Sequence, residues 1–247
     1  MIKKTKVAVT IDTDWASDEV IEYTFEILLK HRVKTTWFIT HDSKIIRRLF
    51  SHSDIFEIGI HPNFLPNSTQ GSTFSDIMSH LLSIYPKAKI MRTHSLYQST
   101  PMFEAVLKNY PAIKADLSLF LPYEKNINPF KFYVCGGKSS YIIRIPYVWE
   151  DDMEMVLPKP AFKFDIKRFS GKGIKIFDFH PLHIALNSAT LGPYEKLKNN
   201  SSELLTVKLN DVFKFRQTKN AGVEDFLKDL LSNQDVRFVH IMEEIER

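Results

Sequence analysis

Side chains that could bind a metal ion or move a proton follow five apolar segments of this sequence. These side chains belong to Asp12 and Asp14, His61, Arg92 and His94, Asp151 and Asp152, and His180 and His183. In parallel α/β folds the loops at the carboxyl ends of the strands converge on one rim, where active sites lie. The repetition at successive strand ends therefore predicts one shared site.

Imidazoles and a carboxylate are suitable ligands for zinc and related divalent ions, and three protein ligands plus a water form a catalytic metal site. Such an ion lowers the pKa of its water, and a neighbouring carboxylate can act as general base. Of Asp12 and Asp14, one can bind the cation while the other accepts the proton. His61 suits a ligand because it begins a loop.

Each of these features also has a plain structural explanation. The two aspartates precede a predicted helix and could cap it. His61 and His180 each stand before a proline, as turn residues often do. On composition alone, Asp151 and Asp152 form an exposed acidic loop. Their joint occurrence favours the chemical interpretation.

The elements that would position these residues alternate between strand-like and helix-like patterns, which predicts an α/β fold. Strands are expected at Val7–Ile11, Lys34–Thr40, Phe56–Ile60, Ala88–Met91, Ile113–Ser118, Tyr141–Ile145, Gly173–Phe179 and Val236–His240. Helices are expected at Glu19–Lys30, capped by Ser17, and at Ser43–Phe50, Phe74–Ile84, Pro101–Asn109 and Glu224–Leu231. We expect a single domain over 1–247, with an irregular excursion at Phe120–Gly137 and a flexible insertion at about 190–222.

Composition limits the function classes. The chain has 247 residues and a formal net charge of +4, with its basic residues scattered among acids, so nucleic acid is not the expected partner. Cys135 is the only cysteine, which excludes an intramolecular disulfide and a cysteine zinc cluster. No run approaches the ~20 apolar residues of a membrane span. The apolar run Val7–Ile11 is too short for an export signal, so a cytoplasmic location is expected. No oligomeric state is predicted.

Taken together, these segments resemble the polysaccharide deacetylase family, carbohydrate esterase family 4 with its NodB-homology domain. The similarity runs in matching order over roughly residues 5–185. It rests on Val7-Ala-Val-Thr-Ile-Asp-Thr-Asp14, Lys34-Thr-Thr-Trp-Phe-Ile-Thr40, Glu57-Ile-Gly-Ile-His61, Arg92, Ile145-Pro-Tyr-Val-Trp-Glu-Asp-Asp152 and Phe177-Asp-Phe-His180. The resemblance implies a distorted (β/α)7 barrel.

The resemblance also implies roles for the residues. Asp12 would be the base, oriented by Arg92, and Asp14 and His61 would be metal ligands. Because Thr13 stretches the first motif, the two aspartate roles could be reversed. His180 would be the general acid.

The third ligand and the group that orients His180 stay open. The family places a second histidine four residues after the first, where this chain has Leu65. We take His94 as third ligand, with His183 or a water as alternatives. Trp149 with Asp151 or Asp152 would hold His180, and we select Asp152. Candidates for substrate contacts are Trp15, Asn63, Trp149 and His183.

The resulting hypothesis is a metal-dependent hydrolase, most simply with zinc, that removes an acyl group from an N-acetylated amino sugar or a surface-polysaccharide precursor. One alternative is a carbohydrate-binding barrel without turnover, which the leucine at position 65 favours. Another is a metal-dependent hydrolase of a non-sugar amide.

Overall fold

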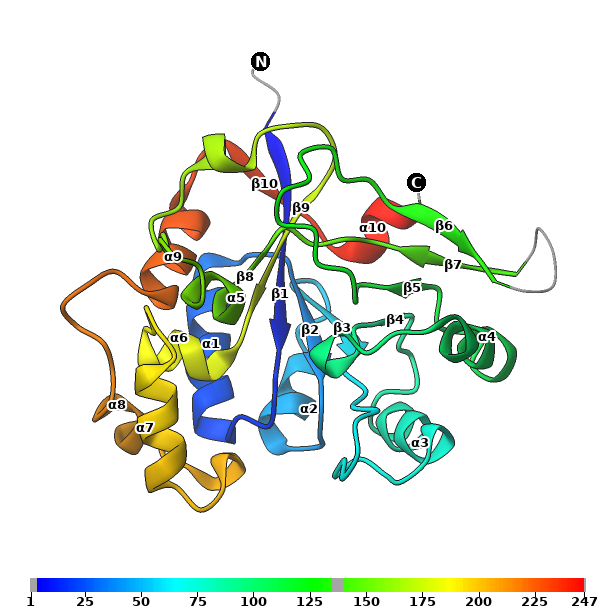
Figure 1. The fold of residues 1–247 in the computed structure, drawn as a ribbon, viewed down its shortest axis with the longest axis horizontal. Helices are drawn as coiled ribbons and strands as arrows, with labels where there is room; N and C mark the ends of the chain where they lie inside the picture. The colour runs from blue at the N-terminus through cyan, green and yellow to red at the C-terminus, as the bar shows by residue number, and fades with distance from the viewer. Residues whose placement is uncertain (1–3, 135–139, 247) are drawn as a thin grey trace.

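The computed structural model describes residues 4–134 and 140–246, and a curled β-sheet forms its centre (Figure 1). The strands are β1 (Thr5–Asp12), β2 (Thr35–Ile39), β3 (Phe56–Ile60), β4 (Ile90–Met91), β5 (Ala115–Asp116), β6 (Phe130–Tyr133), β7 (Tyr141–Arg144), β8 (Trp149–Glu150), β9 (Lys175–Phe179) and β10 (Val236–Phe238). Cys135 lies outside the described residues.

Helices and 3₁₀ turns cover the sheet and its ends. The helices are α1 (Asp18–His31), α2 (Lys44–Phe50), α3 (Phe74–Ile84), α4 (Thr100–Asn109), α5 (Asp151–Met155), α6 (Pro181–Leu186), α7 (Gly192–Asn200), α8 (Leu209–Phe213), α9 (Val223–Ser232) and α10 (Ile241–Ile245). The 3₁₀ turns are η1 (His94–Leu96), η2 (Ile166–Phe169) and η3 (Leu204–Thr206). No helix among the described residues is long and apolar enough to cross a bilayer.

The strands follow the order β6-β7-β5-β4-β3-β2-β1-β9-β8, and β10 pairs with β1 beside this path. β6 runs antiparallel to β7, and every other strand pair within 4–134 and 140–246 is parallel. Parallel strands bring their carboxyl ends to one rim, so the loops after β1, β3, β4, β8 and β9 meet there. This architecture is the expected distorted barrel.

β1 is buried on both faces, as its continuous apolar run predicts. Val7 and Val9 belong to a core shared with the covering helices, whereas Ala8 belongs to a second apolar cluster with Phe38 and Tyr147. Because alternate side chains of a strand point to opposite faces, Thr10 and Asp12 share the face of Ala8. Thr10 and Asp12 thus lie on the same face of the sheet as the second cluster, nearer the rim.

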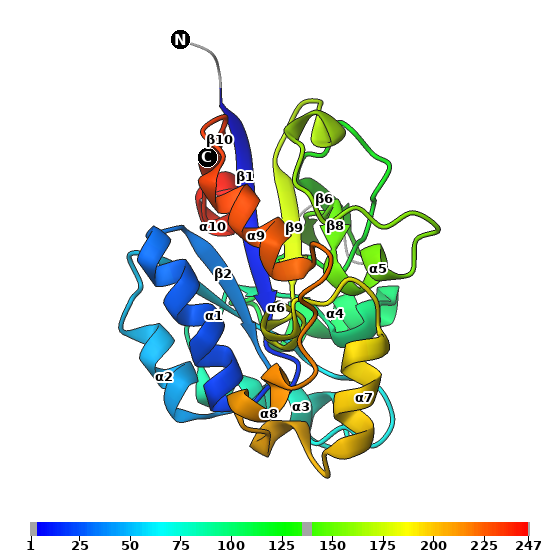
Figure 2. The ribbon, with the colours of Figure 1, turned by 90° about the vertical axis from the view of Figure 1, so that its left-hand side faces the viewer.

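The segment after α6 is more structured than the sequence suggested. It forms α7, η3 and α8, which lie at the same end of the molecule as the carboxyl end of β1 (Figure 2). The segment expected to be a flexible insertion at about 190–222 thus contains two helices and a 3₁₀ turn. Ser17 has no side-chain capping bond to α1. Its hydroxyl instead donates to the Val207 carbonyl at 2.6 Å and ties this segment to the barrel.

Two further differences concern the region before β9. β6 forms inside the expected irregular excursion, and three of its four side chains are exposed, so no apolar pattern marks it. Trp149 and Glu150 form β8 rather than a loop, and Asp151 and Asp152 begin α5. The start of α5 therefore fixes the backbone of Asp151 and Asp152 at the rim.

Candidate active site

The loop after β1 turns sharply to present Asp14. Asp14 and Trp15 have positive φ values of 33° and 54°, which non-glycine residues adopt rarely. The Ala16 amide closes the turn by donating to the Thr13 carbonyl at 2.8 Å, and the Thr13 hydroxyl lies 2.9 Å from that of Thr40 on the next strand end. Such strain persists only where surrounding contacts enforce it, and it is common in active sites.

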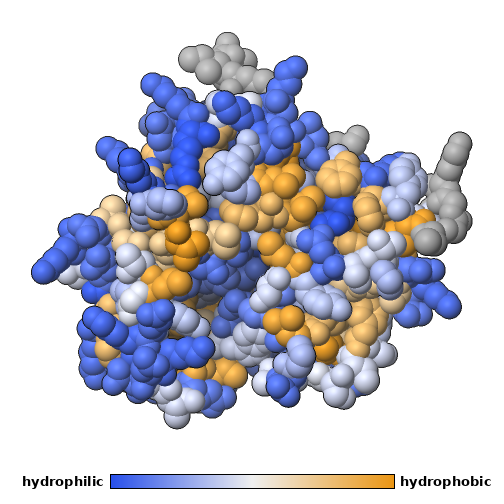
Figure 3. All heavy atoms as spheres, in the orientation of Figure 1, coloured by the Kyte–Doolittle hydropathy of each residue, from blue (hydrophilic) through white to orange (hydrophobic). Residues whose placement is uncertain are grey.

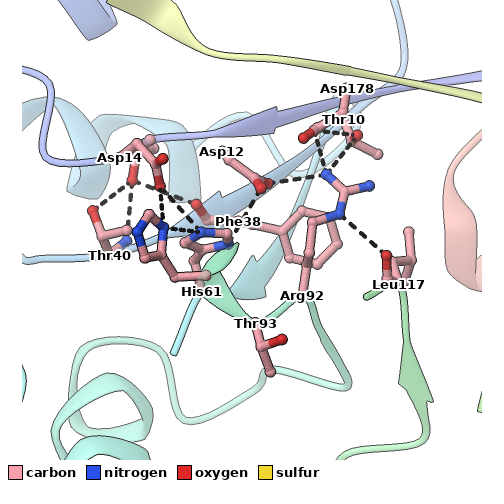
Figure 4. Close-up of polar contacts among 12 residues, drawn as sticks. Thr10, Asp12, Asp14, Phe38, Thr40, His61, Arg92, Thr93, Leu117 and Asp178 are labelled. Carbon is pink, nitrogen blue, oxygen red and sulfur yellow. Dashed lines mark hydrogen bonds and ion pairs between the residues drawn. The ribbon is translucent and has the colours of Figure 1, made fainter. Parts of the chain in front are cut away.

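Asp14, His61 and His94 converge at the rim, although they follow three different strands (Figure 4 labels the first two). Asp14 Oδ1 lies 3.1 Å from His61 Nε2 and 3.4 Å from His94 Nδ1. The two ring nitrogens are 3.4 Å apart. The three atoms form a nearly equilateral triangle.

This triangle has the right size and chemistry for a divalent cation. A tetrahedral zinc ion with bonds of about 2.0 Å separates its ligand atoms by roughly 3.3 Å. Asp14 Oδ1 is buried and accepts no hydrogen bond from any described residue, which leaves its lone pairs available. One carboxylate and two imidazoles also match the ligand preferences of zinc. The residues present therefore fit the expected ion.

Charge stabilises the ionised carboxylate of this cluster. Burial alone would raise the pKa of Asp14, but the charge of His61 and contacts with His180, His61 and His94 hold it well below its usual range. Burial likewise opposes the charged form of His61, yet Asp12 and Asp14 raise the pKa of its ring. The pocket thus favours an anionic oxygen between the imidazoles.

Asp12 lies between Arg92 and His61 (Figure 4). Arg92 Nη1 donates to Asp12 Oδ1 at 3.0 Å, and Asp12 Oδ2 lies 3.3 Å from His61 Nδ1. Arg92 is 1% exposed, and its guanidinium lies over the rings of Phe38 and Tyr147, 4.7 and 4.6 Å from their centroids. Burial opposes this charge, whereas nearby carboxylates, Asp12 first, raise the pKa of Arg92. The arginine is fixed and charged.

Gly59 makes room for this arrangement. A Cβ atom at this position of β3 would lie 2.6 Å from the Phe38 ring, which supports Arg92. Any larger residue would displace that ring. Gly59 therefore leaves room for the Phe38 ring to lie against the guanidinium that bonds to Asp12.

His180 is held from its far side by Asp151. Its Nδ1 lies 2.7 Å from Asp151 Oδ1, and its backbone amide donates to Asp151 Oδ2 at 2.8 Å. Its Nε2 lies 3.4 Å from Asp14 Oδ2. Burial would lower the pKa of His180, but Asp151 and Asp14 raise it well above its usual range.

The choice of Asp152 as the partner of His180 is therefore wrong. α5 begins at Asp151, and that residue directs its carboxylate to His180, while Asp152 lines the open pocket beside it. Asp151 is completely buried. Sequence reasoning named both aspartates, but one position along a helical turn decides which of them reaches the ring.

The site opens into a cavity of about 640 Å³. Trp15, Asn63, His94, Asp152, His180 and His183 form the barrel side of this cavity, and Tyr194, Lys198 and Leu204 form the opposite side. The segment of α7 and η3 thus closes the pocket, which composition alone did not indicate. Figure 3 shows a hydrophilic hollow near the middle of the molecular face.

Two residues expected to contact the substrate, Trp149 and His183, lie in different surroundings. Trp149 does not line this pocket, because its ring is 1% exposed and stacks on Phe226 with centroids 4.1 Å apart. His183 does line it, with Nδ1 3.3 Å from the Ser188 hydroxyl. His183 belongs to no group of convergent ligand atoms found in the described part of the chain. The geometry therefore favours His94 as the third ligand.

Sequence reasoning missed two further acids, the buried Asp178 and the half-buried Glu150. Asp178 shares Arg92 Nη1 with Asp12 and accepts from the Thr10 hydroxyl at 2.7 Å. Burial raises the pKa of Asp178 to about 8, against the lowering effect of Arg92. Burial also raises the pKa of Glu150 well above its usual range. A charged residue inside the apolar run of β9, two positions before His180, was the signal available for Asp178.

The fold and the site together define a barrel of the polysaccharide deacetylase type. The chain belongs to the WbmS-like polysaccharide deacetylase family, whose model matches residues 9–198. The resemblance seen in the sequence motifs and the distorted barrel expected from it are both confirmed.

One solved structure supports this assignment, and a second, more distant match is given beside it. A putative polysaccharide deacetylase involved in O-antigen biosynthesis from Bordetella bronchiseptica matches with a TM-score of 0.78 and 26% identity, over 92% of this chain and 89% of that chain. The Xyl-CE4 domain of a xylanase from the hindgut metagenome of Trinervitermes trinervoides matches with a TM-score of 0.47 and 12% identity, over 98% and 90% of the two chains. No curated protein matches the chain.

Proposed function

We propose that this protein is a metal-dependent deacetylase that hydrolyses the amide of an N-acetylated amino sugar in a surface-polysaccharide precursor. The observation that carries the proposal is the triangle of Asp14, His61 and His94, with sides of 3.1–3.4 Å, beside two further acid–base groups. Membership in a polysaccharide deacetylase family supports the substrate class.

Asp14, His61 and His94 would hold the ion, which we propose to be zinc. When bound, a divalent cation polarises the acyl carbonyl and lowers the pKa of the attacking water. His94 supplies the imidazole that Leu65 cannot. Leu65 is 37% exposed and lines a different cavity. The leucine therefore gives little support to a barrel without turnover.

Asp12 would accept the proton from the attacking water. Arg92 fixes one of its oxygens by the 3.0 Å hydrogen bond, so the carboxylate cannot rotate away from the site. The other oxygen lies 3.3 Å from His61 Nδ1, a buried nitrogen that has no hydrogen-bond partner among the described residues. This second oxygen is therefore the one that would take up the proton.

His180 would protonate the leaving amine from Nε2. Asp151 occupies Nδ1, so the opposite ring nitrogen faces the site, close to Asp14. A carboxyl oxygen of Asp12 also lies within 4.8 Å of a His180 ring nitrogen. The proton acceptor and donor thus flank the same small space, as an amide cleavage requires.

The pocket supports a sugar-sized substrate. Its volume of about 640 Å³ falls within the range of small-molecule sites. Trp15 is held by a 3.1 Å bond from its Nε1 to the Thr69 hydroxyl, and its ring meets His94 edge-on. An aromatic ring fixed beside the cluster offers a face to a sugar ring.

Acetate release tests this proposal. The protein would be stripped with a chelator and assayed on a panel of N-acetylated amino sugars, their oligosaccharides and simple non-sugar amides, with and without zinc. We expect release from an amino sugar only after zinc is restored. Asp12→Asn should retain zinc but lose about 10²- to 10⁴-fold in kcat. The proposal would be refuted if acetate were released from non-sugar amides alone, or if no substrate released acetate at any metal concentration.

A further inference from the structure

The contact between Arg92 and Asp12 is less complete than the two groups allow. An arginine and a carboxylate frequently form two parallel hydrogen bonds, one to each oxygen. Here Arg92 bonds to Asp12 through Nη1 and Oδ1 alone, at 3.0 Å. Arg92 Nη2 is buried and has no hydrogen-bond partner among the described residues. One donor of a buried arginine is therefore unused beside the proposed base.

Asp178 on β9 accounts for this single bond. Its Oδ1 accepts from Arg92 Nη1, so the same nitrogen bridges the carboxylates of Asp12 and Asp178 (Figure 4). Arg92 Nε faces the Leu117 carbonyl at 3.4 Å. A guanidinium turned to offer Nη1 and Nη2 to the two oxygens of Asp12 would give up the bridge to Asp178.

The neighbouring strand fixes Asp178 in this position. Thr10 on β1 is paired with Asp178 in the parallel ladder, so their side chains leave the sheet side by side. The Thr10 hydroxyl donates to Asp178 Oδ1 at 2.7 Å and accepts from Arg92 Nη1 at 2.9 Å. Asp178 is also completely buried. Its Oδ1 is consequently held in one orientation.

Asp178 binds Arg92 as a neutral group. Burial raises the pKa of Asp178 to about 8, against the lowering effect of Arg92, so the protonated form prevails at pH 7. Its Oδ2 is buried without a hydrogen-bond partner among the described residues, which also disfavours the anion. A neutral carboxyl still accepts through its carbonyl oxygen. The positive charge of Arg92 is thus left for Asp12.

We propose that Asp178 is a positioning residue for the deacetylation: by holding Arg92 Nη1, it limits the arginine to one oxygen of Asp12 and keeps Asp12 Oδ2 free for the proton of the attacking water. The inference rests on the proposed function for the role of Asp12. Asp178 does not line the catalytic pocket, and its side-chain bonds are to Thr10 and Arg92. It therefore acts through the arginine.

Crystal structures of two variants test the geometry without catalysis. Asp178→Leu removes the acceptor at similar volume, and Arg92 should then contact both oxygens of Asp12, with a nitrogen within about 3.2 Å of Oδ2. Asp178→Asn keeps an acceptor oxygen in the same place and should leave Oδ2 free of Arg92. An arginine that keeps its single bond to Asp12 in Asp178→Leu would overturn the inference.

Kinetics should separate the same two variants. Asp178→Leu should lower kcat about 10²-fold and leave KM and zinc affinity within a few-fold, because only the proton acceptor is affected. Asp178→Asn should recover most of this loss. Asp116→Leu is the matched control. Asp116 is also completely buried and pairs with a buried arginine, Arg144, at 2.7 Å, but it bonds to neither Asp12 nor Arg92. Its kcat should stay within a few-fold of the parent.

A double-mutant cycle distinguishes positioning from a general structural role. In an Arg92→Met background, Asp178→Leu should not lower kcat further, because the group through which Asp178 acts is gone. Replacing both members of a buried pair by apolar residues is often neutral for stability, so the double variant should fold. Losses that multiply in the double variant would overturn the inference.

A milder variant covers the case in which Asp178→Leu alone does not fold. Thr10→Val removes the hydroxyl that holds Asp178 and should lower kcat about 3- to 10-fold, the equivalent of one hydrogen bond. In the Arg92→Met background it should have no effect. The same loss in both backgrounds would contradict a role through the arginine.

Failure of the deacetylase proposal would give a different result. If the parent releases no acetate but Arg92 contacts both oxygens of Asp12 in Asp178→Leu, the hold of Asp178 on Arg92 is supported and the deacetylase is refuted. Acetate release by the parent, together with an unchanged single bond in Asp178→Leu, would refute the positioning role alone.

Discussion

Asp151 and Asp152 differ in what their carboxylates contact, although they are adjacent in the chain. Asp151 is buried and bonds to both the ring and the backbone amide of His180, whereas Asp152 faces the pocket. A carboxylate on the far nitrogen of a catalytic histidine fixes its tautomer and orientation. Asp151 is therefore the residue on which the orientation of His180 depends.

Substitution of each aspartate separates the two roles. Asp151→Asn should lower kcat about 10²- to 10⁴-fold, because the amide can hold the wrong tautomer of His180. Asp152→Asn, the matched control, should change kcat less than 10-fold. Steady-state acetate release measures both, and an equal loss in the two variants would contradict the assignment.

His94 and His183 were the two histidines considered for the third ligand, beside a water. Of these two histidines, only His94 has a ring nitrogen within 3.4 Å of Asp14 Oδ1 in the described ion pairs. His94→Ala should weaken zinc binding by more than the roughly 10- to 100-fold typical of losing an outer-shell partner. His183→Ala should leave zinc affinity within a few-fold. Isothermal titration calorimetry checks this, and the reverse order would make His183 the ligand.

The positions of the chemically able residues could be predicted from sequence because strand ends share one rim. The contacts between side chains could not be predicted from the sequence. Trp149 precedes an acidic pair and suggested a pocket residue, but strand alternation on β8 sends it into the core against Phe226. The apolar run of β9 marked Asp178 as unusual, but its partners Arg92 and Thr10 lie on other strands and could not be identified from the sequence.

At the scale of elements, Glu224 joins three segments of the fold. It lies near the start of α9 and accepts a 2.5 Å bond from Tyr23 on α1. It also pairs with Arg216, after α8, and with Lys228. Burial would raise the pKa of Glu224, but these partners lower it overall. Burial first, and then the hydrogen bond with Glu224, raise the pKa of Tyr23 to about 12.

This junction predicts a pH-dependent loss of stability. Since the folded-state pKa of Glu224 is lowered, its contribution is present above the unfolded value of about 4.3 and disappears as pH falls below it. Glu224→Gln should lower the free energy of unfolding by about 2–3 kcal/mol at pH 7. The difference from the parent protein should shrink toward zero below about pH 4.

Urea unfolding at both pH values measures this difference. Asp211→Asn is the control, because Asp211 pairs with Lys214 on the surface and exposed pairs contribute only about 0–1 kcal/mol. A Glu224→Gln effect that persists undiminished at low pH would show that packing rather than charge is responsible.

Periodicity predicted the elements that bury several side chains and failed for those that bury few. β1, α1 and α3 have extended patterns of burial that a sequence reveals, and their observed bounds lie close to the expected ones. The helices α7 and α8 bury one side chain each, and the strand β6 buries none. Tertiary contacts such as the Ser17 bond to Val207 stabilise them, and these contacts leave no local pattern.

At the scale of the whole molecule, the ligand set joins loops that are distant in sequence, so ion binding couples to folding. Asp14, His61 and His94 follow β1, β3 and β4, and an ion bound only by the native state stabilises all three loops.

The single domain, the zinc preference and the cytoplasmic location stay predictions.

Zinc should therefore raise the melting temperature. At 100-fold excess over its Kd, a ligand adds about 2.7 kcal/mol, which corresponds to roughly 5–10 °C for a chain of this size. Differential scanning calorimetry should show one transition that moves upward with zinc. His61→Ala should not respond, and an equal shift in that variant would place the stabilising ion elsewhere.

Anomalous diffraction at the zinc absorption edge, from crystals soaked in zinc, would locate the ion itself. We expect one strong peak about 2 Å from each of Asp14 Oδ1, His61 Nε2 and His94 Nδ1. No peak within the triangle, or a peak bound by other residues, would contradict the proposed metal site.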